Sequence, residues 1–409
     1  MPPDNTLSGP KTIWNKNYIC VVLANFILSV GHASVNPLVA TYTKYLNTSA
    51  QLTGLLAGMF FGVSLLFKPF AGPALTKFDN RKLLILTFVL GAFANIGYAV
   101  FHSVPAFAAF RLLSGVQYGL FGALTMTLSA NNLPKERITY GIGILGIGGS
   151  IGFALGPWFG ETILNFGTNL RDEALGFTLM FLFGALMFII GVIPSVIIDP
   201  DRKSREALAS TGVWYKNIFS IHASISATLL LLVCLAYSII QMYTFEFGRQ
   251  YGISGISTFF LVLALTLAVS RPLSGYLNDR IGIRKLLFPA LAVYATAMLV
   301  IGGSRSLWML LIGAVLAAAG YGAALPALQA TGMQSEHAPK RGVASNTIFI
   351  GIDLGWFLGP YLGGLIYAYT TDYSMVFRIG AIPLVLAMIF FAVILPVHSR
   401  RIKELETTQ

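Results

Sequence analysis

Residues 68–82 read KPFAGPALTKFDNRK, and residues 271–285, which lie 203 positions later, read RPLSGYLNDRIGIRK. Each stretch starts with a cation and a proline inside an apolar segment and ends in a basic cluster. The same separation recurs in two more pairs of dipeptides: Gly156-Pro157 with Gly359-Pro360, and Tyr118-Gly119 with Tyr321-Gly322. One offset shared by three separated places indicates that a unit of about half the chain has been duplicated.

The composition excludes a soluble protein. Of the 409 residues, 56% are hydrophobic and only 11% are charged, whereas soluble domains carry about 25% charged residues. A soluble enzyme, a disordered chain and a nucleic-acid binder are therefore excluded, and the apolar sequence suffices for about a dozen membrane spans. The two cysteines, Cys20 and Cys234, lie in apolar runs, so we expect no disulfide framework, metal site or cofactor.

We expect an all-α membrane protein with twelve transmembrane helices, arranged as two six-helix pseudo-repeat halves around a central cavity. The predicted spans are 18–43, 51–71, 83–102, 105–130, 139–165, 175–198, 222–246, 253–274, 285–303, 306–331, 342–369 and 374–397. The charged stretch after the sixth span predicts an N-terminal half of residues 1–198, a cytoplasmic linker of residues 199–221 and a C-terminal half of residues 222–409.

The positive charge indicates the orientation. With the N-terminus inside, all but six of the 27 Lys and Arg residues fall at the cytoplasmic side, as the positive-inside rule requires. The exceptions are Arg111, inside a span, and five residues at the outer side: Lys44, Arg171, Arg249, Arg305 and Arg378. Both termini are therefore predicted to be cytoplasmic, in a bacterial cell membrane. The net charge of +11 reflects topology and attraction to anionic lipid rather than a nucleic-acid partner.

The second repeated stretch carries a known pattern. Residues 275–285, GYLNDRIGIRK, match G-x-L-x-D-R-x-G-x-R-K, the loop signature of the major facilitator superfamily, and the chain resembles these transporters over essentially its whole length. The resemblance implies a gating role for the signature residues Gly275, Asp279, Arg280, Gly282 and Arg284, and for Gly72, Asp79 and Arg81 of the first stretch. Turn formation and topology-setting charge are the structural alternative. The first stretch departs from the pattern, since Thr76 replaces the usual Asp and Asp79 stands where the second Gly is expected.

Two helices carry further patterns of this superfamily. The fourth span contains Arg111, Gly115 and Gly119, similar to its R-x-x-x-G-x-x-x-G pattern. The fifth span resembles the signature of its proton-coupled antiporters, through Gly143, Gly152, Gly156, Pro157 and Gly160. Helix packing is the alternative role for these glycines, because the eleventh span repeats the theme.

Polar residues within the spans are the candidates for binding. Asn25, Ser29, His32 and Asn36 are four, three and four positions apart and share one helical face. Such a stripe must face protein or water. It is predicted to line the cavity, with interhelical hydrogen bonding as the alternative.

Asp353 is the only acid far from both ends of a predicted span, and an apolar environment favours the proton-bearing form of a carboxyl group. We expect it to carry the proton, with His32 as the second candidate and Arg111 as the group that stabilises an anion, either Asp353 or the substrate. Pairing of Asp353 with an arginine is the structural alternative. Further cavity candidates are Asn346, Phe349, Trp356, Gln117, Tyr118, Tyr237, Ser238, Gln241 and Phe245. Glu161, Glu246 and Arg249 lie nearer the outer ends, as gate or surface charges.

Together these features predict a monomeric secondary active transporter, not an enzyme, whose partners are a small molecule, protons and the lipid bilayer. The leading hypothesis is export of a small organic molecule by proton antiport with alternating access. The alternative is proton-coupled uptake or release of a metabolite such as a sugar or an organic anion, which His32 and Arg111 would suit.

Overall fold

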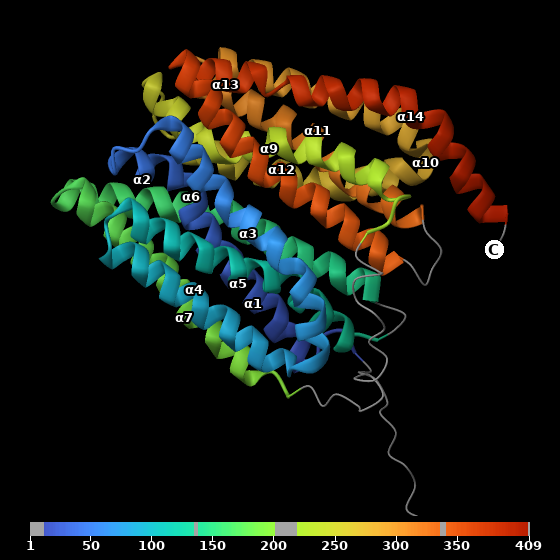
Figure 1. Ribbon diagram of the computed structural model, residues 1–409, viewed down its shortest axis with the longest axis horizontal. Helices are drawn as coiled ribbons and strands as arrows, with labels where there is room; N and C mark the ends of the chain where they lie inside the picture. Colours follow the sequence, from blue (N-terminus) through green and yellow to red (C-terminus); the bar gives the residue numbers. More distant parts are fainter. Residues whose placement is uncertain (1–11, 135–137, 201–218, 336–340, 408–409) are drawn as a thin grey trace, which may run out of the picture.

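The structure is a computed structural model that describes residues 12–134, 138–200, 219–335 and 341–407, and these residues form helices and no strand (Figure 1). The first half contains α1 (Lys16–Val35), the 3-10 turn η1 (Asn36–Leu38), α2 (Val39–Tyr45), α3 (Ala50–Lys77), α4 (Asn80–Val100), α5 (Val104–Asn131), α6 (Ile138–Leu170) and α7 (Glu173–Ile197). The second half contains α9 (Ser224–Gln250), α10 (Ser257–Gly303), α11 (Leu307–Gln334), α12 (Arg341–Thr370), α13 (Tyr373–Ile379) and α14 (Ile382–Thr407).

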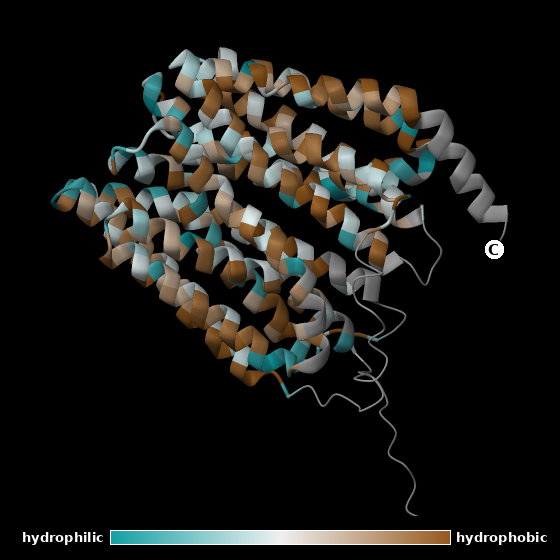
Figure 2. Ribbon diagram, in the orientation of Figure 1, coloured by the Kyte–Doolittle hydropathy of each residue, from teal (hydrophilic) through white to brown (hydrophobic). Residues whose placement is uncertain are grey.

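Twelve segments of the described chain are long enough to cross a membrane. Eleven meet both a length and a hydropathy requirement, and α6, with 33 residues, is the twelfth. The long helix α10 contains two of the eleven, Ser257–Asn278 and Arg280–Gly303. Figure 2 shows hydrophobic residues along the helices and hydrophilic ones gathered at their ends. The predicted all-α membrane fold is confirmed, and the span boundaries differ from the predicted ones by a few residues.

Two local features differ from straight helices. The first span was predicted as one helix, but it breaks at η1, where Pro37 has no backbone N–H to donate. In α10, Gly282 has φ +74°, a conformation that favours glycine. Asp79, 203 positions earlier, has φ −64° and instead caps α4, because its Oδ1 accepts a hydrogen bond of 2.9 Å from the Arg81 N–H. The sequence difference between the two repeated stretches therefore corresponds to two different backbone turns.

The two halves repeat the same packing. α1 lies against α6 in the first half and α9 lies against α12 in the second, while α3 packs on α5 and α10 on α11. In Figure 1 the blue-to-green half lies below the yellow-to-red half. Between the halves, α3 packs against α12 and α6 against α10. The predicted two-half architecture is confirmed, whereas the predicted domain boundaries stay predictions, since residues 201–218 lie outside the described part.

The Gly-Pro motifs lie where helices come closest within each half. A Cβ atom at Gly156 would lie 2.4 Å from the Cβ atom of Ala33 on α1, and one at Gly359 would lie 1.9 Å from the Ser238 hydroxyl on α9. Only glycine permits these approaches. The structure thus gives these glycines a packing role in both halves, and their specific role in antiport stays a prediction.

Candidate substrate and proton site

A buried ion pair joins the two halves. The Lys68 Nζ atom on α3 lies 2.5 Å from Oδ2 of Asp353 on α12, and the two side chains are 20% and 6% exposed. The ring of Phe349, one turn before Asp353, has its centroid 4.9 Å from the same ammonium group. The partner of Asp353 is therefore a lysine rather than the arginine considered from the sequence. The charge distribution along the sequence predicts Lys68 at the cytoplasmic side, whereas in the structure it pairs with Asp353 between the halves.

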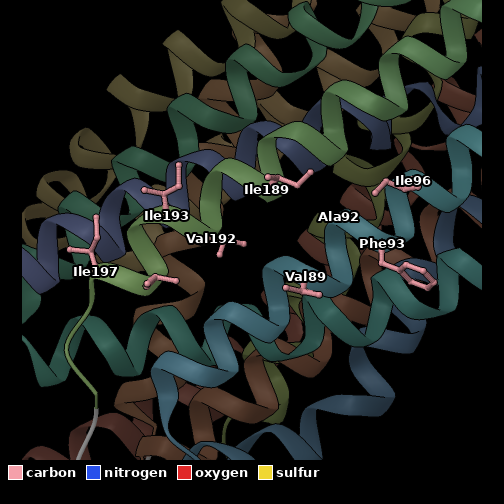
Figure 3. Close-up of a pocket in the computed structure, with 9 residues that line it drawn as sticks. Val89, Ala92, Phe93, Ile96, Ile189, Val192, Ile193 and Ile197 are labelled. Atoms are coloured by element: carbon pink, nitrogen blue, oxygen red, sulfur yellow. The ribbon is translucent and has the colours of Figure 1, made fainter.

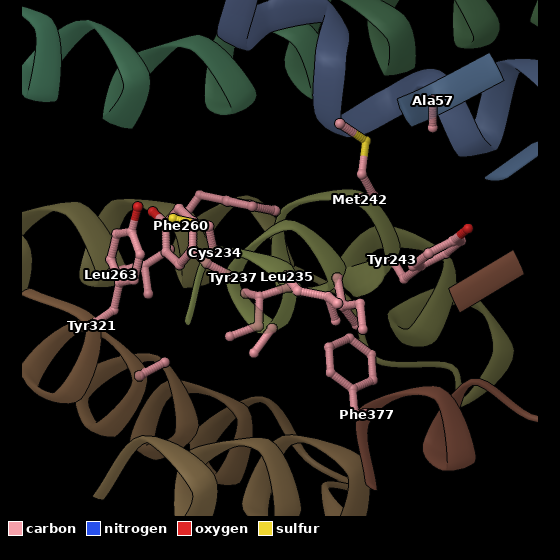
Figure 4. Packing of buried hydrophobic residues seen from close by; sticks show 14 of the residues in the cluster. Ala57, Cys234, Leu235, Tyr237, Met242, Tyr243, Phe260, Leu263, Tyr321 and Phe377 are labelled. Atoms are coloured by element: carbon pink, nitrogen blue, oxygen red, sulfur yellow. The ribbon is translucent and has the colours of Figure 1, made fainter. Parts of the chain in front are cut away.

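An aromatic row continues this contact between the halves. The Trp356 ring, one turn after Asp353, lies 4.7 Å from the Phe61 ring on α3 and 5.5 Å from the Tyr237 ring on α9. Tyr237 stacks flat on Tyr321, with centroids 3.8 Å apart and an interplanar angle of 3°. Figure 4 labels both residues within the buried cluster. The sequence predicted Trp356 and Tyr237 for this site but missed Phe61 and Tyr321. The repeated Tyr-Gly dipeptides were the signal that could have indicated Tyr321.

On the other side of Phe61, the row continues into the first half. The Tyr118 ring lies 5.7 Å from Phe61 and 5.2 Å from His32. The His32 ring is also 5.2 Å from Phe60 and 5.0 Å from Phe188, all in edge-on arrangements. Gln117, fully buried, is its polar neighbour. His32 thus lies in an aromatic pocket within the first half, and its role as proton carrier stays a prediction.

The rest of the polar stripe on α1 makes hydrogen bonds inside the first half. Asn25 donates to the Leu145 carbonyl oxygen on α6 at 2.9 Å, and the Ser29 hydroxyl donates to the Asn25 carbonyl oxygen at 2.7 Å. Asn36 accepts from Arg111 at 2.7 Å. All four residues of the stripe are buried. Interhelical hydrogen bonding therefore describes Asn25 and Asn36, and contact of the stripe with a substrate stays a prediction.

Arg111 is held entirely within the first half. Its buried guanidinium donates to Asn36 Oδ1 at 2.7 Å and to the carbonyl oxygens of Leu56 and Ala57 on α3 at 3.2 and 3.0 Å. It also lies over the Phe60 ring, 4.9 Å from the centroid. Arg111 was expected to stabilise an anion, either Asp353 or the substrate. In the structure it donates to Asn36 of η1 and to α3, while Lys68 is the cation paired with Asp353. Its role toward a substrate stays a prediction.

The remaining candidates for the cavity lie at different levels along α9 and α12. Gln241 donates to the Tyr237 hydroxyl at 2.8 Å, so both side chains belong to the aromatic row. Ser238 donates to backbone carbonyls of its own helix and of Gly355 on α12, at 2.9 and 3.2 Å. Phe245 stacks on Phe260 at 4.9 Å, one to two turns further along α9. Asn346 lies on α12 two turns before Asp353.

One end of the bundle is called the distal end here, because it lies opposite the first and last described residues. It is formed by the loops of residues 46–49, 101–103, 171–172, 251–256, 304–306 and 371–372. There Glu246 on α9 is completely buried, and its carboxylate accepts from Thr41 at 2.7 Å, Lys44 at 3.2 Å and Arg249 at 3.2 Å. Thr41 and Lys44 belong to α2 of the other half. Glu246 is therefore a contact between the halves rather than a surface charge.

Glu161 makes a second such contact at the distal end, since its Oε2 accepts from the Ser257 N–H of α10 at 3.1 Å.

The predicted gating loops lie at the opposite end, called the terminal end. Arg81 donates to the Val196 carbonyl oxygen at the end of α7, at 2.6 Å. The Arg280 guanidinium lies 4.5 Å from the centroid of the Tyr276 ring. Gly72 lies within α3, and the side chain of Asp279 lies outside what the structure describes. The gating role of this set, including Gly275, Gly282 and Arg284, stays a prediction.

A separate groove lies between α4 and α7 on the outer surface of the first half (Figure 3). Its lining is entirely hydrocarbon, formed by Val89, Ala92, Phe93, Ile96, Ile189, Val192, Ile193, Val196 and Ile197. With no polar side chain to orient a solute, this groove suits lipid chains and is distinct from the inter-half site.

A bundle of two equivalent six-helix halves that meet around polar and aromatic residues is typical of multi-pass membrane transporters built from internal repeats. The sequence profile of the Major Facilitator Superfamily matches residues 21–302 and 255–409, and the chain belongs to this superfamily. It is a transporter of small molecules and not an enzyme.

Relatives in sequence agree with this assignment, and solved structures share the fold. "Multidrug resistance protein MdtG" of Salmonella heidelberg is 26% identical over 383 residues, which cover 90% of this chain and 92% of that protein. The MdtG protein of Citrobacter koseri is 25% identical over 372 residues, covering 87% and 89%. Among solved structures, a bacterial homolog of the human lysosomal transporter Spinster, inward-facing and occupied, has a TM-score of 0.79 at 15% identity, covering 95% of this chain and 97% of that one. The nucleoside transporter NupG has a TM-score of 0.72 at 16% identity, covering 92% and 98%.

Proposed function

We propose that the chain exports a small organic molecule in exchange for protons, with Asp353 as the group that carries the proton. The names of its multidrug-resistance relatives support export, at an identity too low to specify the compound. The observation that carries the proposal is the Lys68–Asp353 ion pair between α3 and α12.

The ion pair links proton binding to movement of the halves. Because Lys68 and Asp353 belong to different halves, their charges must separate when the two halves rock apart on the side of the membrane where the pair lies. Separation leaves a buried carboxylate without its cation, which is costly in a bilayer. A proton on Asp353 removes that charge and releases Lys68, so the protonated transporter moves between its two states more easily than the charged one.

The aromatic row places the substrate beside the proton site. Trp356 is one turn from Asp353 and contacts Phe61 and Tyr237, which belong to different halves. A flat apolar molecule among these rings would contact both halves at once, and its departure would leave Asp353 open to protonation. The substrate and the proton then compete for one region, as exchange requires.

The structure gives less support to the alternative hypothesis, proton-coupled transport of a metabolite such as a sugar or an organic anion. This hypothesis relied on His32 and Arg111 to suit an anionic ligand, but the Arg111 guanidinium already donates to Asn36 and to two backbone carbonyls. We therefore place export first.

We also propose a cytoplasmic location for both termini, on the positive-inside argument, and a monomeric transporter in the bacterial cell membrane. The distal end would then face outward. Contacts of Glu246 and Glu161 join the halves at that end, which supports assigning this conformation to a state closed toward the outside.

The proposal is tested with Asp353→Asn, which keeps the side-chain shape and removes the charge. In proteoliposomes, a compound chosen from a ligand-stabilisation screen should no longer be concentrated by a pH gradient, whereas exchange of that compound down its own gradient should persist. Asp172→Asn, at an exposed acid in a distal loop, is the matched control and should behave as wild type. If Asp353→Asn concentrates the compound at the wild-type rate, proton coupling lies elsewhere, and His32 is the next residue to test.

A further inference from the structure

A second cation also crosses between the halves. Arg271 on α10 is partly buried, and its Nη1 donates to the Ser150 hydroxyl on α6 at 2.8 Å. Its Nε is buried without a hydrogen-bond partner. Among the residues that the structure describes, no acid forms an ion pair with this guanidinium.

The contact of Arg271 is the counterpart of the Lys68 contact. Arg271 stands 203 positions after Lys68, and Asp353 stands 203 positions after Ser150. Each half therefore has one cationic side chain that contacts the equivalent helix of the other half: α12 for Lys68 and α6 for Arg271. Lys68 meets a carboxylate there, whereas Arg271 meets a neutral hydroxyl, which leaves its charge uncompensated.

An uncompensated cation within a membrane bundle is costly, and such residues generally face a cavity and a partner. A guanidinium offers several donors in a planar arrangement that suits carboxylate and related oxyanions. In Arg271 the Nε donor is still free. The Ser150 hydroxyl accepts from Arg271 and donates its own proton to the Gly146 carbonyl oxygen at 2.9 Å. Arg271 thus provides a free donor, and neither side chain provides a negative charge.

Arg271 also lies close enough to the aromatic row to interact electrostatically with the hydroxyl groups of Tyr237 and Tyr321, the two rings that stack on each other. A molecule bound there would meet flat apolar faces on one side and an unpaired cation on the other.

We propose that Arg271, held in place by Ser150, binds an anionic group of the transported molecule, a carboxylate or similar oxyanion, while its aromatic or other flat apolar part lies against the row that contains Tyr237. This inference rests on the proposed export function and specifies its substrate class. Lys68 does not compete for the anion, because Asp353 already neutralises it.

The test measures binding without any proton gradient. Purified protein is equilibrated by dialysis with three probes of similar shape: 2-naphthoate, neutral 2-naphthamide and cationic 2-naphthylmethylammonium. We expect 2-naphthoate to bind at least about tenfold more tightly than the other two, as a charge-assisted hydrogen bond provides. Arg271→Gln should remove this preference and Arg271→Lys should retain part of it. Equal affinities of the three probes, no measurable binding of 2-naphthoate, or an unchanged preference in Arg271→Gln overturns the proposal.

Ser150 provides a matched pair of variants. Ser150→Asp copies Asp353 into the equivalent position and supplies Arg271 with an internal carboxylate, so the affinity for 2-naphthoate should fall about tenfold or more. Ser150→Asn adds similar volume without charge and should retain the preference for the anion. If both variants bind 2-naphthoate equally, the site is not at Arg271. Because dialysis needs no proton coupling, a failure here leaves the Asp353→Asn transport result intact, and the converse also holds.

Discussion

Ser150 and Asp353 occupy equivalent positions in the two halves, and each accepts the cationic side chain that reaches across from the opposite half. The duplication has kept the geometry of this contact but not its chemistry. A carboxyl group gains and loses a proton, whereas a serine hydroxyl does not titrate near neutral pH. Proton binding can therefore loosen the contact between α3 and α12 without affecting the equivalent contact between α6 and α10.

Removing Lys68 alone should destabilise the protein. In Lys68→Met the Asp353 carboxylate stays buried without its cation, and breaking a buried pair in this way costs about 3 kcal/mol. The double variant Lys68→Met with Asp353→Asn removes both charges and should recover most of that loss in thermal unfolding. Lys16→Met breaks the exposed pair with Asp199, whose side chains are 56% and 62% exposed, and should change stability very little. A double variant no more stable than Lys68→Met would contradict the importance of this pair.

Neutralising Glu246 should open the distal end. Among the described residues, Glu246 is the only acid that pairs with both Lys44 and Arg249. Glu246→Gln removes this negative charge, so the closed state loses stability relative to the open one. Hydrogen exchange measured by mass spectrometry should become faster in α2 and at the start of α3. Glu161→Gln is the comparison, because Glu161 accepts a single backbone hydrogen bond, and its effect should be smaller. Unchanged exchange in Glu246→Gln would show that this carboxylate does not hold the end closed.

The fold could be predicted from the sequence for two reasons. The bilayer imposes long apolar helices, and the duplication places similar motifs at one fixed separation along the chain. The interruption at Pro37 was missed, although proline inside a span is a recognised cause of such breaks. Hydropathy measures the length of a span and is insensitive to a short 3-10 turn within it.

The candidate site was predicted only in part, for a physical reason. Asp353 stands out because an acid far from the ends of an apolar helix is rare. Its partner Lys68 lies near the end of its span, where hydropathy does not distinguish a buried cation from a surface one. The contacts of Arg111 could not be predicted because its acceptors include the backbone carbonyls of Leu56 and Ala57, and a sequence does not show which carbonyls a neighbouring helix presents.

Close packing of α3 on α12 at the distal end should be sensitive to side-chain size. A Cβ atom at Gly54 would lie 2.4 Å from the Pro360 carbonyl oxygen, so Gly54→Leu should force the two helices apart. We expect a loss of about 1–3 kcal/mol in unfolding free energy and slower transport. Gly122→Leu is the control, because a Cβ atom at Gly122 meets nothing within 4 Å. Equal stability of the two leucine variants would contradict the tight contact.

The proposed orientation predicts which loops impermeant reagents reach in intact cells. Ser103 lies in an exposed distal loop and makes no side-chain cap hydrogen bond, whereas Phe219 is exposed at the terminal end. In a background with Cys20 and Cys234, which are both buried, replaced by serine, a membrane-impermeant maleimide should label Ser103→Cys from outside. Phe219→Cys should be labelled only after the membrane is opened. The opposite pattern would place the basic loops outside, against the positive-inside rule, and the Glu246 contacts would then close the cytoplasmic side. Asp353 would then take up its proton from the outside in the conformation described here. The proposed direction of transport, which is export, would have to be reversed.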